Sequence, residues 1–156
     1  MNPQETGNSK NTLSKTGSVV FFLLAVIGLV YLVYTRQLLS DKPVGIAVQV
    51  LAAFLMIWAR ITFGSRSFHA VANTTAGGLV TNGPYKWLRH PIYASIIYFV
   101  WAGVFSHLSA DAIAAALLVS GGLIGRMLIE EIFLRKAYAE YRDYSKRAKR
   151  LIPFLF

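Results

Sequence analysis

The sequence predicts an all-α integral membrane protein with about four transmembrane helices. Hydrophobic residues make up 55% of the 156 residues and charged residues only 15%, against about 25% charged residues in ordinary soluble domains. Long uncharged runs recur along the chain, near the roughly 20 residues that a helix needs to cross a bilayer. The basic residues behind the net charge of +9 lie between and after these runs, which indicates membrane lipids and not nucleic acid as their partner.

The first two spans are predicted at residues 17–34 and 44–63. The polar stretch 1–16 is predicted to be a disordered cytoplasmic tail, and residues 17–156 a single membrane domain. The first run also has the length of a signal peptide. It leads into TRQLLSDK and not into a small-residue cleavage site, however, which favours a retained anchor.

Spans three and four, at residues 91–106 and 110–134, are predicted to form a helical hairpin because only a short link separates them. The fourth run is uncharged up to Gly125 and continues without a helix breaker. One long helix is therefore expected to leave the membrane as it passes Arg126. Gly121 and Gly125 form a GxxxG pattern, which would let this helix approach a neighbour closely.

The distribution of lysine and arginine predicts the orientation. These residues are concentrated at the two ends of the chain and in the middle connection, so both termini are expected in the cytoplasm. Near the C-terminus, Tyr138, Tyr141 and Tyr144 recur every three residues beside basic residues, which predicts an amphipathic cytoplasmic helix. Its tyrosines would either form a core stripe or lie on an anionic leaflet, and the four spans favour the leaflet.

Two segments carry polar residues that a structural membrane protein does not need. In the first, GPYKWLRHPIY, Arg89 and His90 precede Pro91, which suits the first turn of a helix. Free N–H groups and the positive end of the helix dipole make such a place receptive to a carboxylate or phosphate. An interfacial anchor of aromatic and basic residues explains the segment equally well.

The second segment, RMLIEE, places Arg126, Glu130 and Glu131 in a run apolar enough to enter the bilayer. A charge at the centre of a membrane helix costs about 2.5–3.5 kcal/mol, so these charges favour a functional site over a helix that simply leaves the membrane. Arg126 and Glu130 share a helix face and can pair. The absence of cysteine and the scattered positions of the three histidines predict no metal site.

Three motifs in order, GLVTNGPYKWLRHPIYAS, RMLIEE and AYAEYRDYSKRAKRLIPF, resemble the isoprenylcysteine carboxyl methyltransferase family, which is related to the phospholipid N-methyltransferases. The resemblance covers residues 77–154. It implies S-adenosylmethionine as cofactor and a lipid or a prenylated small molecule or protein as substrate. The predicted orientation places the active site on the cytoplasmic side. Ser95 stands where the family usually has glycine, so tighter packing is expected there.

The resemblance also implies roles for individual residues. Arg126 corresponds to an arginine that contacts the substrate carboxylate and is the predicted catalytic residue. Glu130 is expected to hold cationic or hydroxyl groups of the cofactor, and Arg89 with His90 to cap its carboxylate. The complete set predicted to bind the cofactor is Gly78, Leu79, Val80, Tyr85, Arg89, His90, Pro91, Ile92, Tyr93 and Glu130.

The two possible acceptor groups, a carboxylate and an amine, differ in whether they carry a proton at neutral pH. A carboxylate is ionised at neutral pH and needs a cation, which Arg126 supplies, whereas an amine must first lose a proton, for which Glu131 is the candidate base. This favours an isoprenylcysteine-like carboxylate over a phospholipid amine. Two other interpretations stay open. One is an NADPH-dependent membrane reductase of the sterol type, and the other is a non-catalytic lipid-binding or scaffolding protein in which the charges are structural.

Overall fold

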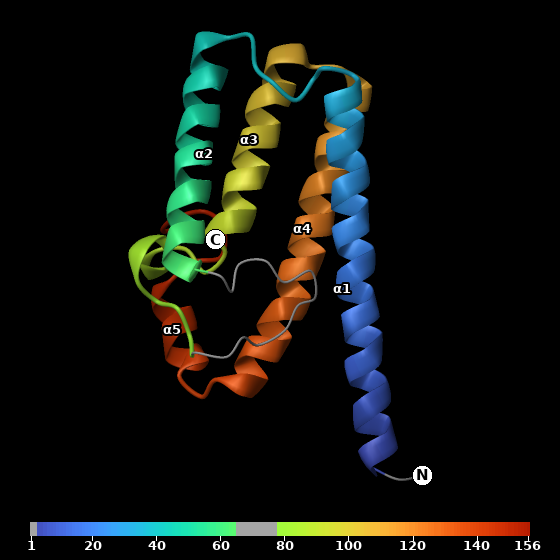
Figure 1. Cartoon of the computed structure of the whole chain (residues 1–156), viewed down its shortest axis with the longest axis vertical. Coiled ribbons are helices and arrows are strands. Elements are labelled where there is room, and N and C mark those ends of the chain that lie inside the picture. The colour runs from blue at the N-terminus through green and yellow to red at the C-terminus, as the bar shows by residue number, and fades with distance from the viewer. Residues whose placement is uncertain (1–2, 65–77) are drawn as a thin grey trace.

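The computed structural model describes the chain at residues 3–64 and 78–156. Within these ranges all regular elements are helical, which confirms the predicted all-α class. They are α1 Pro3–Tyr34, α2 Pro43–Phe63, the 3-10 helix η2 Gly83–Lys86, α3 Pro91–His107, α4 Ala110–Ala137 and α5 Tyr141–Arg147. Figure 1 shows the four long helices side by side, with α1 against α4 and α2 against α3.

Three of the described helices are long and apolar enough to cross a membrane: α2, α4 and the Lys15–Tyr34 part of α1. The fourth apolar helix, α3, has 17 residues, the lower end of the range for a spanning helix. It ends at His107; Leu108 then takes a left-handed conformation, and the hydroxyl of Ser109 caps α4 by accepting from the backbone N–H of Ala112. These two residues make the predicted hairpin between α3 and α4.

Helix α1 begins at Pro3, well before residue 17, where the first span was predicted to begin. Composition predicted a disordered tail over residues 1–16, but the backbone is helical from Pro3 onward. Extending a helix that the span has already nucleated costs much less than starting one, and the polar residues after Pro3 include no further proline. The cytoplasmic location of this segment stays a prediction.

Small residues bring α1 and α4 into close contact. A Cβ atom added at Gly122 would lie 2.5 Å from the carbonyl oxygen of Phe21 and 2.8 Å from the nitrogen of Ala25, and one at Gly125 would meet the Phe21 ring. A Cβ at Gly121 would meet nothing within 4 Å. Of the predicted GxxxG pair, therefore, only Gly125 faces the neighbour. The second close approach is at Gly122, because Gly121 does not lie on the face of α4 that contacts α1.

The C-terminal helix is short, and its tyrosines point inward. Tyr141 and Tyr144 are buried and form a cluster with Ala148, against which Leu79 and Tyr138 pack. The prediction that this tyrosine stripe lies on the leaflet is therefore wrong for Tyr141 and Tyr144. Tyrosines three residues apart beside basic side chains are compatible with a core stripe and with an interfacial face. Here α5 folds back onto the bundle, so Tyr141 and Tyr144 are buried.

Candidate active site

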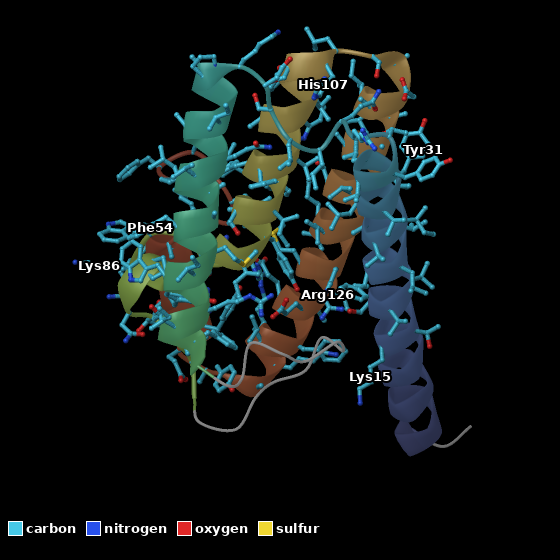
Figure 2. All side chains as sticks on the ribbon, turned by 45° about the horizontal axis from the view of Figure 1, so that its top comes forward. Lys15, Tyr31, Phe54, Lys86, His107 and Arg126 are labelled. Atoms are coloured by element: carbon cyan, nitrogen blue, oxygen red, sulfur yellow. The ribbon has the colours of Figure 1, made fainter. Side chains whose placement is uncertain are left out.

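The candidate site lies where the beginning of α3 meets the second half of α4, near Arg126 (Figure 2). His90 is not helical, with φ −128° and ψ 58°, and Pro91 opens α3 as predicted. The backbone N–H groups of Arg89 and His90 donate to the carbonyls of Lys149 and Arg150, at 2.6 and 3.1 Å. The backbone just before the helix N-terminus, where an anion was expected to bind, thus attaches the C-terminal segment.

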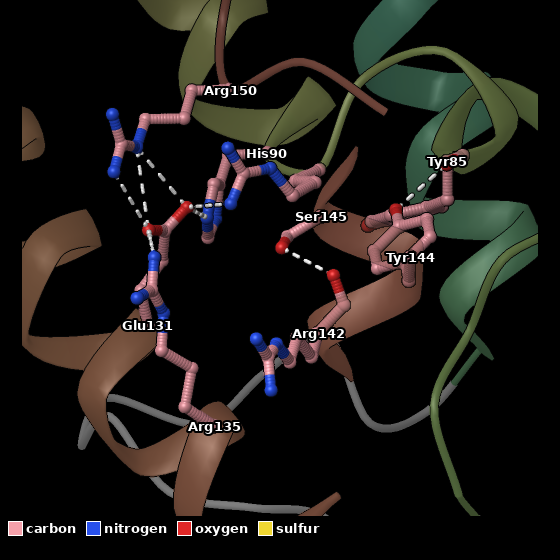
Figure 3. Close-up of polar contacts among 9 residues, drawn as sticks. Tyr85, His90, Glu131, Arg135, Arg142, Tyr144, Ser145 and Arg150 are labelled. Atoms are coloured by element: carbon pink, nitrogen blue, oxygen red, sulfur yellow. Dashed lines mark hydrogen bonds and ion pairs between the residues drawn. The ribbon is translucent and has the colours of Figure 1, made fainter. Parts of the chain in front are cut away.

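Glu131 is the centre of an ionic cluster at this junction (Figure 3). Its side chain is 4% exposed and lies 2.6 Å from Nη1 of Arg89 and 3.5 Å from Nε2 of His90. Arg150 donates to both carboxylate oxygens at 3.1–3.3 Å, and Arg135 lies 3.6 Å away. With both oxygens occupied, Glu131 is a structural anchor and is not available as the general base considered for an amine acceptor.

The side chains of Arg89 and His90 are therefore both directed toward Glu131. The ring of His90 also stacks on that of Tyr93, with centroids 5.7 Å apart and planes 12° apart. Three buried nitrogens of this pair make no hydrogen bond among the described residues; Nη1 of Arg89 and Nε2 of His90 face Glu131 as ion pairs, which leaves Nε of Arg89. A buried donor without a partner costs about 1–3 kcal/mol, so this nitrogen is suited to an acceptor group on a ligand.

Tyr93 joins the two charged residues of α4 that were predicted to carry the chemistry. Its hydroxyl accepts from Nε of Arg126 at 2.9 Å and donates to Oε2 of Glu130 at 2.8 Å. Arg126 and Glu130 were predicted to pair along the helix face, and the structure places the tyrosine hydroxyl between them. The α3–α4 hairpin thus brings together three of the predicted site residues.

Helix α1 contributes two further contacts to Arg126. Nη1 of the guanidinium donates to Oγ of Ser18 at 3.2 Å, and its carbon lies 5.3 Å from the centroid of the Phe22 ring. Arg126 is 5% exposed and Ser18 is fully buried. Hydrogen bonds and an aromatic face offset the cost of keeping a cation in apolar surroundings. Sequence reasoning missed these contacts; the signal that could have found them is a serine at the start of an apolar run.

Tyr85 lies in the same electrostatic neighbourhood as Glu130. Its backbone carbonyl accepts from the hydroxyl of Tyr144 at 2.7 Å, and its ring lies 5.4 Å from that of Phe63. Burial, followed by the negative charge of Glu130, raises the pKa of Tyr85 far above its usual range, and the positive charge of Arg60 offsets only part of this. The phenol therefore stays protonated and can act as a hydrogen-bond donor.

The remaining residues predicted to bind the cofactor differ in conformation, packing and burial. Gly78, with φ +80°, takes a left-handed conformation that favours glycine. Leu79 packs against the Tyr141 and Tyr144 cluster. Val80 follows it and is partly buried, as is Ile92. Ser95, at the position where glycine was expected, is buried and donates its hydroxyl to the Ile92 carbonyl at 2.7 Å, so it fits without an unpaired polar group.

A match to a known family covers most of the residues of this candidate site. The family model for phospholipid methyltransferases matches residues 41–141, which include α2, η2, α3 and α4 but not α1. The chain is 31% identical over 116 residues to a protein-S-isoprenylcysteine O-methyltransferase of Tribolium castaneum, covering 72% of this chain and 41% of that protein. It is 32% identical over 124 residues to the human protein-S-isoprenylcysteine O-methyltransferase, covering 77% and 44%.

A third relative has a different name. The cobalt-zinc-cadmium resistance protein CzcN of Cupriavidus metallidurans is 32% identical over 79 residues, covering 49% of this chain and 36% of that protein. In the part of the chain that the structure describes, no group of three or more His, Cys, Asp or Glu side chains could hold a metal ion. The chain spans less than half the length of these three relatives. No solved structure matches it.

Proposed function

Because the chain belongs to the phospholipid methyltransferase family, we propose that it transfers a methyl group from S-adenosylmethionine to the carboxylate of a lipid-borne, isoprenylcysteine-like acceptor. The observation that carries the proposal is the buried guanidinium of Arg126, which Tyr93 and Ser18 orient inside an apolar helix. The names of the relatives from Tribolium castaneum and human support the same class of acceptor.

The residues at the site fit the proposed cofactor. Glu130, which accepts a hydrogen bond from the Tyr93 hydroxyl, offers a carboxylate to cationic or hydroxyl groups. The protonated phenol of Tyr85, whose pKa the charge of Glu130 raises, offers a hydrogen-bond donor in the same neighbourhood. The buried, unpartnered Nε of Arg89 offers a donor to a carboxylate. The backbone from Gly78 to Val80, with His90, Pro91 and Ile92, is proposed as the remaining wall. When bound, the cofactor supplies a methyl group already activated by the sulfonium.

Arg126 is proposed to hold the acceptor. It lies one helical turn before Glu130 along α4, about 6 Å deeper in the span, so a carboxylate carried by a lipid meets it from the bilayer side. The guanidinium is a planar fork suited to bidentate recognition of a carboxylate. Holding both reactants in one geometry, away from water, is the contribution that the chain must make. A carboxylate needs no general base.

A second candidate follows from the description of the matched family, which names phospholipids. Methyl transfer to a phospholipid amine requires a base near the acceptor. Glu131 has both oxygens engaged by the arginines of its cluster. Arg126, the cation beside the proposed acceptor position, would repel a protonated amine. Both features favour the carboxylate.

The proposal is tested by an acceptor assay on the purified protein in nanodiscs, with S-adenosylmethionine labelled in its methyl group. A farnesylcysteine analogue is expected to gain a methyl ester that alkali releases as volatile methanol. Phosphatidylethanolamine is expected to stay unlabelled. Label in the phospholipid alone would favour the amine acceptor. Calorimetric titration with S-adenosylhomocysteine and with NADPH separates both from a reductase, which would bind only the second.

A further inference from the structure

The last residues of the chain form a closed turn with apolar side chains on its outside. The N–H groups of Leu151 and Ile152 both donate to the carbonyl of Phe156, at 2.7 and 2.6 Å. Phe154 is 87% exposed and Leu155 is 77% exposed. We call residues 152–156 the C-terminal hook. Apolar surface of this kind is unfavourable in water by roughly 25 cal/mol per Å², so it indicates a non-aqueous environment.

The hook lies beside the membrane-spanning helices and not beyond them. The Tyr98 hydroxyl donates to the carbonyl of Leu151, and Tyr98 lies seven residues after Pro91, about 10 Å along α3. Leu151 is also buried in a cluster with Met127 of α4, against which Leu55 of α2 packs. Figure 1 shows the C-terminus level with the lower turns of α2 and α3, and α5 further out.

Basic side chains come directly before the hook. Lys146 and Arg147 are exposed, and Lys149 and Arg150 are partly exposed. The carboxylate of Asp143 is paired with Lys146 at 2.8 Å. A belt of cations next to exposed aromatic and aliphatic side chains is the composition of segments that lie in a membrane interface, with the cations on anionic headgroups.

We propose that the C-terminal hook inserts into the interface of the leaflet at the site end of the bundle, with Phe154 and Leu155 among the acyl chains and the preceding cations on anionic headgroups. The hook is also connected to the candidate site. The Arg150 guanidinium lies 5.2 Å from the centroid of the Phe156 ring and donates to Glu131. The Arg150 side chain therefore connects the hook directly to the ionic cluster around Glu131.

The chain contains no cysteine, so single cysteines at Phe154 and Leu155 can carry a nitroxide spin label without background. Power-saturation spectroscopy in vesicles of phosphatidylcholine with phosphatidylglycerol compares collisions of the label with oxygen, which concentrates in the bilayer, and with a water-soluble nickel chelate. Leu51→Cys, 70% exposed in the middle of α2, is the lipid control. Arg142→Cys is the aqueous control.

The ratio of oxygen to nickel collisions at Phe154 and Leu155 is expected to shift away from the Arg142 value toward the Leu51 value. In phosphatidylcholine alone, which lacks anionic headgroups, the shift is expected to be smaller. Ratios equal to that of Arg142 in both lipids would overturn the proposal. Low collision rates with both reagents, together with spin–spin broadening, would also overturn it, because a second copy of the chain would then cover the hook.

Discussion

Arg126 shows how a cation is kept inside an apolar helix. Its guanidinium contacts a phenol from α3, a serine hydroxyl from α1 and the face of Phe22. Each contact offsets part of the cost of removing the charge from water, which is large when a buried charge is unpaired. The same contacts fix the direction of the side chain. Preorganised charge of this kind is what recognition of an acceptor carboxylate requires.

Glu130 is the residue whose replacement tests the cofactor half of the site. Glu130→Ala is expected to weaken the binding of S-adenosylhomocysteine by about 1–3 kcal/mol, because a polar group of the ligand loses its buried partner. This is about a fivefold or larger increase in Kd, measurable by calorimetry in detergent. Glu140→Ala, at the exposed residue before α5, is the matched control. Unchanged affinity in a folded Glu130→Ala protein would remove Glu130 from the site.

At the residue scale, the sequence singled out three residues that the structure brings together. Arg126 and Glu130 were recognised because charge is rare in an apolar run, and Tyr93 because of its motif, and the structure joins all three. The contact between Arg126 and Ser18 was not predictable, because 108 residues separate the pair. Arg150 was one of seven basic residues near the C-terminus, and only the folded backbone distinguishes it.

At the scale of elements, the Glu131 cluster joins three segments. Arg89 and His90 belong to the approach to α3, Glu131 and Arg135 to α4, and Arg150 to the segment after α5. The backbone bonds from Arg89 and His90 to that last segment reinforce the junction. The start of α3, and with it Tyr93, is thereby fixed relative to Arg126.

Glu131→Gln removes the negative charge of this cluster without changing its shape. Leaving buried cations uncompensated costs about 3–5 kcal/mol, so the free energy of unfolding is expected to fall by that amount in a detergent-denaturation titration. The exposed Glu140→Gln serves as control and is expected to change it by less than about 0.5 kcal/mol. Equal stabilities of the two variants would show that the cluster does not join the elements.

The contact between α1 and α4 offers a matched pair of substitutions. Gly122→Ala places a methyl group 2.5 Å from a backbone oxygen of α1, whereas Gly121→Ala meets nothing within 4 Å. Overpacking costs about 1–3 kcal/mol, and alanine in a helix is otherwise favoured over glycine. Thermal unfolding is therefore expected at a lower temperature for Gly122→Ala and at an unchanged or higher temperature for Gly121→Ala. The reverse order would contradict the packing.

The elements themselves were predictable because hydropathy decides them. The bounds of α2, residues 43–63, differ from the predicted span by a single residue, and the α3–α4 hairpin follows from its two-residue link. The tertiary role of the tyrosines in α5 was not predictable. Whether Tyr141 and Tyr144 face lipid or protein depends on where the short helix folds, which local composition does not specify.

At the scale of the whole molecule, the two ends of the bundle differ in charge. The links from α1 to α2 and from α3 to α4 lie together at one end, while α5 and the start of α1 lie at the other (Figure 1). The first end carries Arg36 and Lys42, and most of the other lysines and arginines lie toward the site end. The positive-inside rule then predicts that the candidate site faces the cytoplasm.

This orientation is tested by single-cysteine labelling in intact cells. Asp41→Cys and Ala110→Cys, both exposed at the end away from the site, are expected to react with a membrane-impermeant maleimide from outside. Arg142→Cys at the site end is expected to react only after the membrane is permeabilised. Protection of Asp41 or Ala110 until permeabilisation would reverse or abolish the proposed topology.

The proposal that Arg126 holds the acceptor, while Glu130 serves the cofactor, is tested most directly by Arg126→Lys, with two measurements on the same preparation. Lysine keeps the charge but loses the planar fork that binds a carboxylate through two N–H groups. The variant is expected to retain most of its affinity for S-adenosylhomocysteine and to lose most of its methyl transfer to a farnesylcysteine analogue. Near-normal transfer with lysine would show that Arg126 only balances charge beside Glu130 and would contradict its assignment to the acceptor.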